Sequence, residues 1–168
     1  VIPMRIECWL STSLRRWFPR SEPVVLNRLK LQALRGEQVS FQACVRVSDA
    51  DRATAVSIGL AGGEDLAVRL RRVGCVPVPH HNTATPRDEL DGLGHIPGYV
   101  PDVLFDEQEA QVAPHEVQAF WVTVRVPEQA EPGRRELALT LQVGEETRKL
   151  TAVLEVLPAV LQPRQSFP

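Results

Sequence analysis

The chain has 168 residues, of which 43% are hydrophobic and 24% are charged, a balance typical of one globular domain. Its formal net charge of −2 argues against nucleic acid or an anionic membrane surface as a partner. No apolar run approaches the roughly 20 residues of a membrane span, and no signal peptide is visible in the N-terminal stretch, which charged residues interrupt.

Most of the expected regular structure is β-strand. Apolar residues alternate with polar ones in four segments, which is typical of half-buried antiparallel strands. In chain order, strands are expected at Arg5–Leu10, Arg28–Leu34, Val39–Val47, Ala53–Leu60, Leu66–Val73, Phe120–Val126, Leu137–Val143 and Leu150–Val156. The segment Ser11–Trp17 is the one place that favours a helical turn, with a Ser cap at its start and Pro19 as its stop.

Turn-forming residues separate these strands. Gly36 lies between two of them, Gly62 and Gly63 are expected to join the next pair as a hairpin, and Gly144 closes the last hairpin. About eight short strands with such breaks predict an all-β chain folded as an antiparallel β-sandwich, immunoglobulin-like or jelly-roll-like. The residues expected in its core are Phe41, Val45, Val122, Val124, Leu139, Leu141 and Leu154.

The sandwich is expected to comprise residues 4–157. Residues 158–168 are rich in Pro and apolar side chains, which is typical of an extended linker toward a downstream domain. The chain has three cysteines, Cys8, Cys44 and Cys75. A small and odd number of cysteines does not predict a disulfide framework. We interpret them as small buried apolar residues. With no visible signal peptide, they favour a cytoplasmic protein.

The segment from Val78 to Ala119 is predicted to be one long loop. Loops longer than about 12–15 residues are uncommon and usually functional or disordered. This one carries the only Tyr and several large apolar residues, which favours an ordered loop. We expect it to offer a surface to another domain or to a ligand, or else to cover its own sheet. The residues proposed for this surface are His80, His81, Asn82, Thr83, His95 and Tyr99.

Two tryptophans are candidates for the same surface. Trp9 and Trp121 each alternate with polar or charged residues along their strands, so both are predicted to point away from the main core. Three explanations stay open for such outward rings: the long loop folds over them, another domain docks on them, or a sugar stacks on them.

The sequence offers little that predicts catalysis or metal binding. The adjacent His80 and His81 point in opposite directions on an extended segment, and no Cys pair supplies a zinc spacing. The acidic cluster that includes Asp88 and Asp91 could bind calcium or provide an acid–base pair, but a solvated loop face explains it better. We find no nucleophile motif and no phosphate-binding loop, and we expect no cofactor and no metal.

Three stretches carry a family resemblance: Arg35–Gln42; Arg72–Thr83, followed by Pro97–Asp102; and Gln118–Pro127, followed by Ala130–Gly133. They resemble the N-terminal β-sandwich domain of bacterial glycoside hydrolases of the family 123 β-N-acetylgalactosaminidase type and their uncharacterised relatives. The likeness covers nearly the whole chain. One departure is the Arg-Arg pair that follows Gly133, where such domains usually have Tyr or Thr. The relatives' catalytic acidic pair lies in a separate barrel domain, so the resemblance implies no catalytic residue here.

The resemblance implies a non-catalytic accessory β-sandwich domain that packs against a downstream catalytic barrel of the same polypeptide. The parent protein would then be a glycoside hydrolase that removes a terminal N-acetylhexosamine by substrate-assisted hydrolysis. The alternative is a free-standing β-sandwich module that binds carbohydrate or protein. A third, less favoured hypothesis is an independent hydrolase that uses the acidic loop. Carbohydrate is a partner of this chain if it is a carbohydrate-binding module or an independent hydrolase. None of the three hypotheses involves nucleic acid or a membrane.

Overall fold

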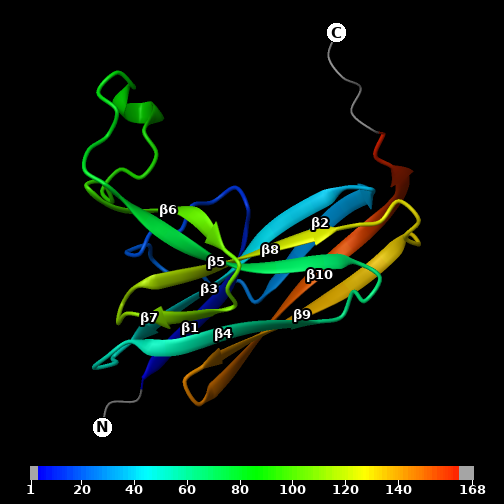
Figure 1. Ribbon diagram of the computed structural model, residues 1–168, viewed down its shortest axis with the longest axis horizontal. Helices are drawn as coiled ribbons and strands as arrows, with labels where there is room; N and C mark the ends of the chain where they lie inside the picture. The colour runs from blue at the N-terminus through cyan, green and yellow to red at the C-terminus, as the bar shows by residue number, and fades with distance from the viewer. Residues whose placement is uncertain (1–3, 163–168) are drawn as a thin grey trace.

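The computed structural model describes residues 4–162 and places them in two packed five-stranded sheets (Figure 1). In spatial order, the first sheet consists of β1 (Arg5–Thr12), β3 (Gln38–Ser48), β8 (Val117–Arg125), β5 (Ala67–Val78) and β6 (Gly98–Phe105). The second consists of β2 (Arg28–Arg35), β10 (Glu146–Val160), β9 (Gly133–Val143), β4 (Thr54–Ala61) and β7 (Glu109–Val112). The predicted all-β sandwich is confirmed.

The core forms where the inner faces of the two sheets meet. Because side chains alternate along a strand, every second residue of β3 and β8 points to the second sheet. Phe41 of β3 pairs with Val122 of β8, and both are fully buried. All seven residues predicted for the core lie in this one buried cluster: Phe41, Val45, Val122, Val124, Leu139, Leu141 and Leu154. The alternating pattern therefore identifies both the strands and their inner faces.

The prediction of one long loop from Val78 to Ala119 is wrong in the extent of the loop. Strand β5 continues to Val78, and β6, β7 and the start of β8 occupy much of the second half. The longest irregular part is residues 79–97, which contain the 3₁₀ turn η1 (Arg87–Glu89), and the connections 106–108 and 113–116 are short. Pro101 masks β6 in the sequence pattern, because proline is unfavourable inside a sheet. Strand β6 is the edge of its sheet, where a missing N–H is tolerated.

Other local expectations are also corrected. No helical turn forms at Ser11–Trp17, since β1 runs on to Thr12 and an irregular segment follows. Gly62 and Gly63 do not close a hairpin: they carry the chain from β4 in the second sheet to β5 in the first. Strand β10 ends at Val160 rather than near Leu157, so the first three residues expected in the linker belong to the sandwich. The last six expected linker residues, 163–168, lie outside the described residues.

One pairing is parallel, whereas the alternation predicts antiparallel sheets. Strand β10 runs parallel to β2 and antiparallel to β9. Alternation reveals which residues face inward but carries no information on the direction of the neighbouring strand. The hairpin between β9 and β10, by contrast, is predicted from Gly144 and is present, with Glu146 paired to Val143.

The three cysteines differ from each other more than expected. Cys44 is buried, Cys8 is half-buried and Cys75 is exposed. Burial raises the pKa of the Cys8 thiol to about 12 and raises the pKa of Cys44 well above its usual value. Partial burial also raises the pKa of Cys75, with the nearby Glu116 acting in the same direction. The interpretation of all three as buried apolar residues is therefore wrong for Cys75.

An ion pair ties the β4–β5 connection to β9. The Nη2 of Arg135 lies 2.7 Å from Oδ2 of Asp65, and its Nε donates to both carboxylate oxygens. The same Nη2 also donates to the carbonyl oxygen of Glu131 at 2.7 Å. The hydrogen bonds from Arg135 lower the pKa of Asp65 from its ordinary value of 3.8.

We expect Asp65→Asn to reduce the free energy of unfolding at pH 7 by about 0.5 kcal/mol, the size typical of a partly exposed ion pair. Because the folded-state pKa is lowered, the pair stabilises the fold at pH values above 3.8 and loses this effect as the pH falls through the lowered value. Urea unfolding at pH 7 and at pH 3 should therefore show a smaller difference between the two proteins at pH 3. A matched Glu22→Gln variant, whose parent side chain is 85% exposed, should differ little at either pH.

Candidate functional site

A second apolar cluster lies on the outer face of the first sheet, separate from the main core. It contains Trp9 of β1, Cys44 of β3 and Ala119 of β8, together with Trp17 from the segment that follows β1. The rings of Trp9 and Trp17 meet edge to face at 5.0 Å between centroids. Trp9 thus points away from the main core as predicted, but Trp17 covers it.

Residues 13–27 form this cover, and backbone hydrogen bonds hold them to the sheet. The N–H of Leu10 donates to the carbonyl of Leu26 at 2.7 Å, and the N–H of Val117 donates to the carbonyl of Pro19 at 2.8 Å. Trp9 is 0% exposed as a result. The proposal that Trp9 belongs to a ligand or interdomain surface is therefore wrong, because no ligand could reach a fully buried ring.

Trp121 remains accessible and lines a pocket of about 430 Å³ on this outer face. We call it the Trp121 pocket. Its floor comes from four neighbouring strands of the first sheet, β3, β8, β5 and β6, and its walls come from residues 13–17 and from the loop before β6. The lining residues that matter below are Trp17, Gln42, Val73, Asp91, Asp102 and Trp121, together with Leu104, Arg15 and Arg16.

Several contacts fix the walls of the Trp121 pocket. Arg16 forms an ion pair with Asp91 at 3.2 Å, which joins the segment after β1 to the loop before β6. The guanidinium of Arg15 lies 4.0 Å from the centre of the Trp17 ring, in cation–π geometry. The buried amide of Gln42 donates to the carbonyl oxygens of Thr12 and Arg15 at 3.0 and 2.7 Å.

The irregular segment 79–97 extends beyond the sandwich at one end (Figure 1). His95 anchors its second half, because its ring stacks on Phe18 with centroids 4.3 Å apart. His95 and Tyr99 line a small pocket of about 220 Å³ together, and Tyr99 is 62% exposed. The residues of the first half that are expected at the surface, His80, His81, Asn82 and Thr83, lie at neither of these two pockets.

The structure thus divides the candidate residues. Trp121 belongs to one pocket, His95 and Tyr99 to another, and the His80–Thr83 run lies apart from both, largely exposed. Sequence reasoning missed the walls of the Trp121 pocket. A signal for them is present: Trp17 and the two preceding arginines stand in a short segment that cannot bury a Trp by itself. A covering role explains that ring better than the expected helical turn.

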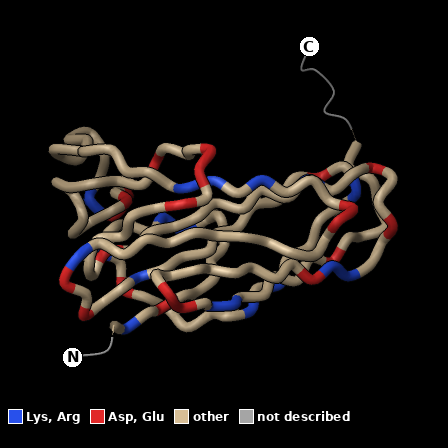
Figure 2. The backbone as a smooth tube through the Cα atoms, turned by 60° about the horizontal axis from the view of Figure 1, so that its bottom comes forward, with Lys and Arg blue, Asp and Glu red and all other residues tan. Residues whose placement is uncertain are grey.

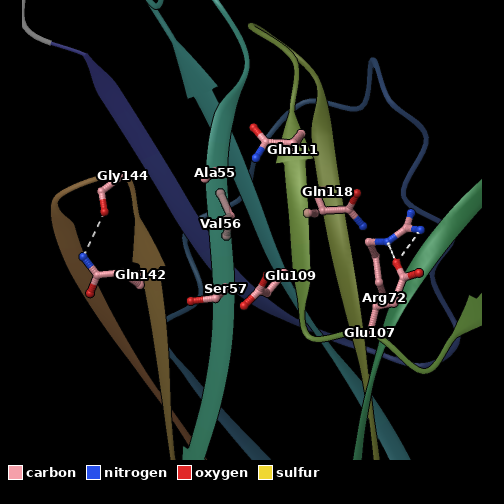
Figure 3. Close-up of a pocket in the computed structure, with 11 residues that line it drawn as sticks. Ala55, Val56, Ser57, Arg72, Glu107, Glu109, Gln111, Gln118, Gln142 and Gly144 are labelled. Carbon is pink, nitrogen blue, oxygen red and sulfur yellow. Dashed lines mark hydrogen bonds and ion pairs between the residues drawn. The ribbon is translucent and has the colours of Figure 1, made fainter.

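Another pocket, of about 480 Å³, opens at the edge where the two sheets meet (Figure 3). Glu107 and Glu109 both line it, but Glu107 is paired with Arg72 at 2.7 Å. Gln118 donates to the carbonyl oxygens of Val73 and Ala119, so its amide group is also occupied by the fold. Glu107 and Gln118 are therefore engaged by contacts within the fold, as is typical of a polar sheet edge.

Among residues 4–162, no three His, Cys, Asp or Glu side chains gather closely enough to hold a metal ion. In the same part of the chain, no helix is long and apolar enough to cross a membrane. Basic and acidic residues are interspersed along both sheets, as Figure 2 shows for the described backbone.

A comparison of the sequence with protein-family models and with curated proteins gives no match. Among solved structures, a family 123 glycoside hydrolase from Clostridium perfringens is similar, with a TM-score of 0.68 and 11% sequence identity. The match covers 95% of this chain and 28% of that enzyme, so this chain spans under a third of its length.

Two further similarities are weaker. The N-terminal domain of PorA has a TM-score of 0.43 at 11% identity, covering 91% of this chain and 99% of that one. A type I cohesin–dockerin complex from Clostridium thermocellum has a TM-score of 0.40 at 9% identity, covering 90% and 99%. At 11% identity, the likeness to the family 123 glycoside hydrolase shows the fold alone, and the two weaker similarities carry no argument.

Proposed function

We propose that this chain is a non-catalytic accessory β-sandwich domain of a multi-domain glycoside hydrolase related to family 123. The observation that carries the proposal is the uneven coverage of the structural match: nearly all of this chain superimposes on a minor part of a much longer glycoside hydrolase. The stretches that carry the family resemblance agree with it. In this proposal the sandwich comprises the residues from Met4 to the end of β10, and the residues after it lead to a downstream catalytic barrel.

The docking surface that we propose is the end of the sandwich formed by segment 79–97 and the start of β6. Large apolar side chains are exposed there, with Leu93 at 47% and Tyr99 at 62%. The exposed polar run His80–Thr83 adds hydrogen-bonding groups, which suit the mixed polar and apolar interfaces between domains of one chain.

The open reading frame that encodes the chain tests the proposal at once. A frame that continues beyond Pro168 into a (β/α)-type barrel with its own acidic pair supports an accessory domain. A stop codon directly after Pro168 contradicts it and favours a free-standing module instead.

The purified chain alone is expected to hydrolyse no glycoside. Most glycosidases use a positioned pair of acidic groups, and in this chain Glu107 and Asp91 form ion pairs with arginines. A chromogenic β-N-acetylgalactosaminide and the corresponding glucosaminide, incubated with the chain, should release chromophore no faster than in buffer. Turnover that disappears in an Asp88→Asn or Asp91→Asn variant would contradict this expectation and return the acidic loop to consideration as a catalytic site.

A further inference from the structure

The Trp121 pocket has the composition of a small-molecule site. Val73, Leu104 and Trp121 give it an apolar floor, and charged side chains stand at its rim. Its volume of about 430 Å³ lies within the range of ligand pockets, roughly 300–1,000 Å³. Such a floor and rim suit a ligand that has one apolar face and polar groups around its edge.

The charges at the rim favour a neutral ligand. Arg15 and Arg16 are matched by Asp91 and Asp102, so their formal charges cancel. A phosphate or a carboxylate would meet carboxylate repulsion here as well as guanidinium attraction. Hydroxyl groups, in contrast, can donate to the carboxylates and accept from the guanidinium N–H groups. A polyhydroxylated, uncharged molecule therefore matches all four side chains.

Trp17 closes one wall of the pocket and is only 2% exposed. Its Nε1–H has no hydrogen-bond partner among the described residues, but the nitrogen is itself buried, so a ligand in the pocket does not reach it.

The pocket is also held in shape before any ligand arrives. The ion pair of Arg16 with Asp91, the two hydrogen bonds of Gln42 and the contact between Trp9 and Trp17 link its walls to the sheet. A site whose groups are already fixed loses little conformational entropy on binding.

From these observations we propose that the Trp121 pocket binds one pyranose ring of a neutral carbohydrate. The apolar face of the sugar lies against Trp121, and its hydroxyl groups contact Asp91 and Asp102. This goes beyond the accessory role and does not depend on it, since the pocket is built entirely from residues of this chain.

The three indole N–H signals of the ¹⁵N-labelled chain provide the test, because the chain has three Trp residues. The probes are the methyl β-glycosides of N-acetylgalactosamine, N-acetylglucosamine, galactose and glucose, with glucuronic acid as the charged comparison. At least one neutral sugar should shift the Trp17 and Trp121 signals saturably at millimolar concentration, while the signal of the buried Trp9 moves least. Glucuronic acid should bind more weakly.

Variants separate specific binding from a general solvent effect. Asp102→Asn and Trp121→Ala should each weaken the sugar roughly tenfold, as expected for loss of a hydrogen bond to a charged group or of the aromatic floor. Glu107→Gln, in the other pocket, should leave the affinity unchanged. Unfolding curves establish that each variant is folded, and Asp102→Asn suffices if Trp121→Ala is not. No saturable shift with any of the four sugars, or equal shifts in Asp102→Asn, overturns the inference and leaves the accessory role untouched.

Discussion

Replacement of Phe41 by Ala is expected to lower the free energy of unfolding by about 3–5 kcal/mol, the usual cost of removing a large aromatic ring from a core. Phe41 is 0% exposed and lies in the middle of β3, where it pairs with Val122 and faces the second sheet. Its removal leaves a cavity, because the backbone hydrogen bonds between strands hold both sheets in place and prevent them from closing around the gap. Urea or thermal unfolding measures the loss.

Phe105→Ala is the matched control, since it removes the same side chain from an edge strand. Phe105 is 40% exposed at the end of β6, where its ring contacts the guanidinium of Arg72. Its truncation should cost about 1 kcal/mol, near the average for a single substitution. If the two variants lost equal stability, or if Phe41→Ala left the unfolding midpoint unchanged, the assigned core face of β3 would be wrong.

Gly62→Ala is expected to cost about 2–3 kcal/mol through backbone strain and a steric clash. Gly62 has φ = +90°, a conformation that residues with a side chain rarely adopt. A Cβ at this position would lie 2.2 Å from the backbone oxygen of Glu136 in β9. Because that oxygen belongs to a strand, the connection from β4 to β5 would have to move as a whole.

Gly59→Ala supplies the contrast in the strand that precedes this connection. Its Cβ would meet no atom within 4 Å, and alanine is favoured over glycine inside a strand by about 0.5–1 kcal/mol. Unfolding midpoints of the two variants should therefore move in opposite directions. Equal shifts of the unfolding midpoint in the two variants would show that the β4–β5 connection does not approach the backbone of β9 closely at Gly62.

Sequence patterns are most informative where burial is one-sided and periodic. In β3 and β8 the alternation alone identifies the strands, their inner faces and core residues such as Val122. It is less informative at the edges. Pro101 makes β6 unrecognisable, and the direction of β10 relative to β2 depends on long-range topology rather than on local pattern. Gly62 and Gly63 are recognisable as a turn, but a turn residue does not reveal whether the chain stays in one sheet.

The alternation of apolar and polar residues predicts only part of the candidate site. The outward position of Trp9 and Trp121 follows from alternation, and the structure agrees that both lie outside the main core. What covers an outward ring is decided by how irregular segments fold back over the sheet. Residues 13–27 cover Trp9, and residues 13–17 among them wall the pocket beside Trp121. Neither result can be derived from a periodic pattern.

The central claim, that this sandwich serves a larger glycoside hydrolase by docking on its catalytic domain, is tested most directly by hydrogen exchange. Exchange would be measured on this chain alone and on the full polypeptide encoded by its gene. The account predicts added protection at His80–Thr83 and at Ile96–Val100 in the full polypeptide, with unchanged rates in the core strands β3 and β8. Identical protection of these two segments in both proteins would contradict it.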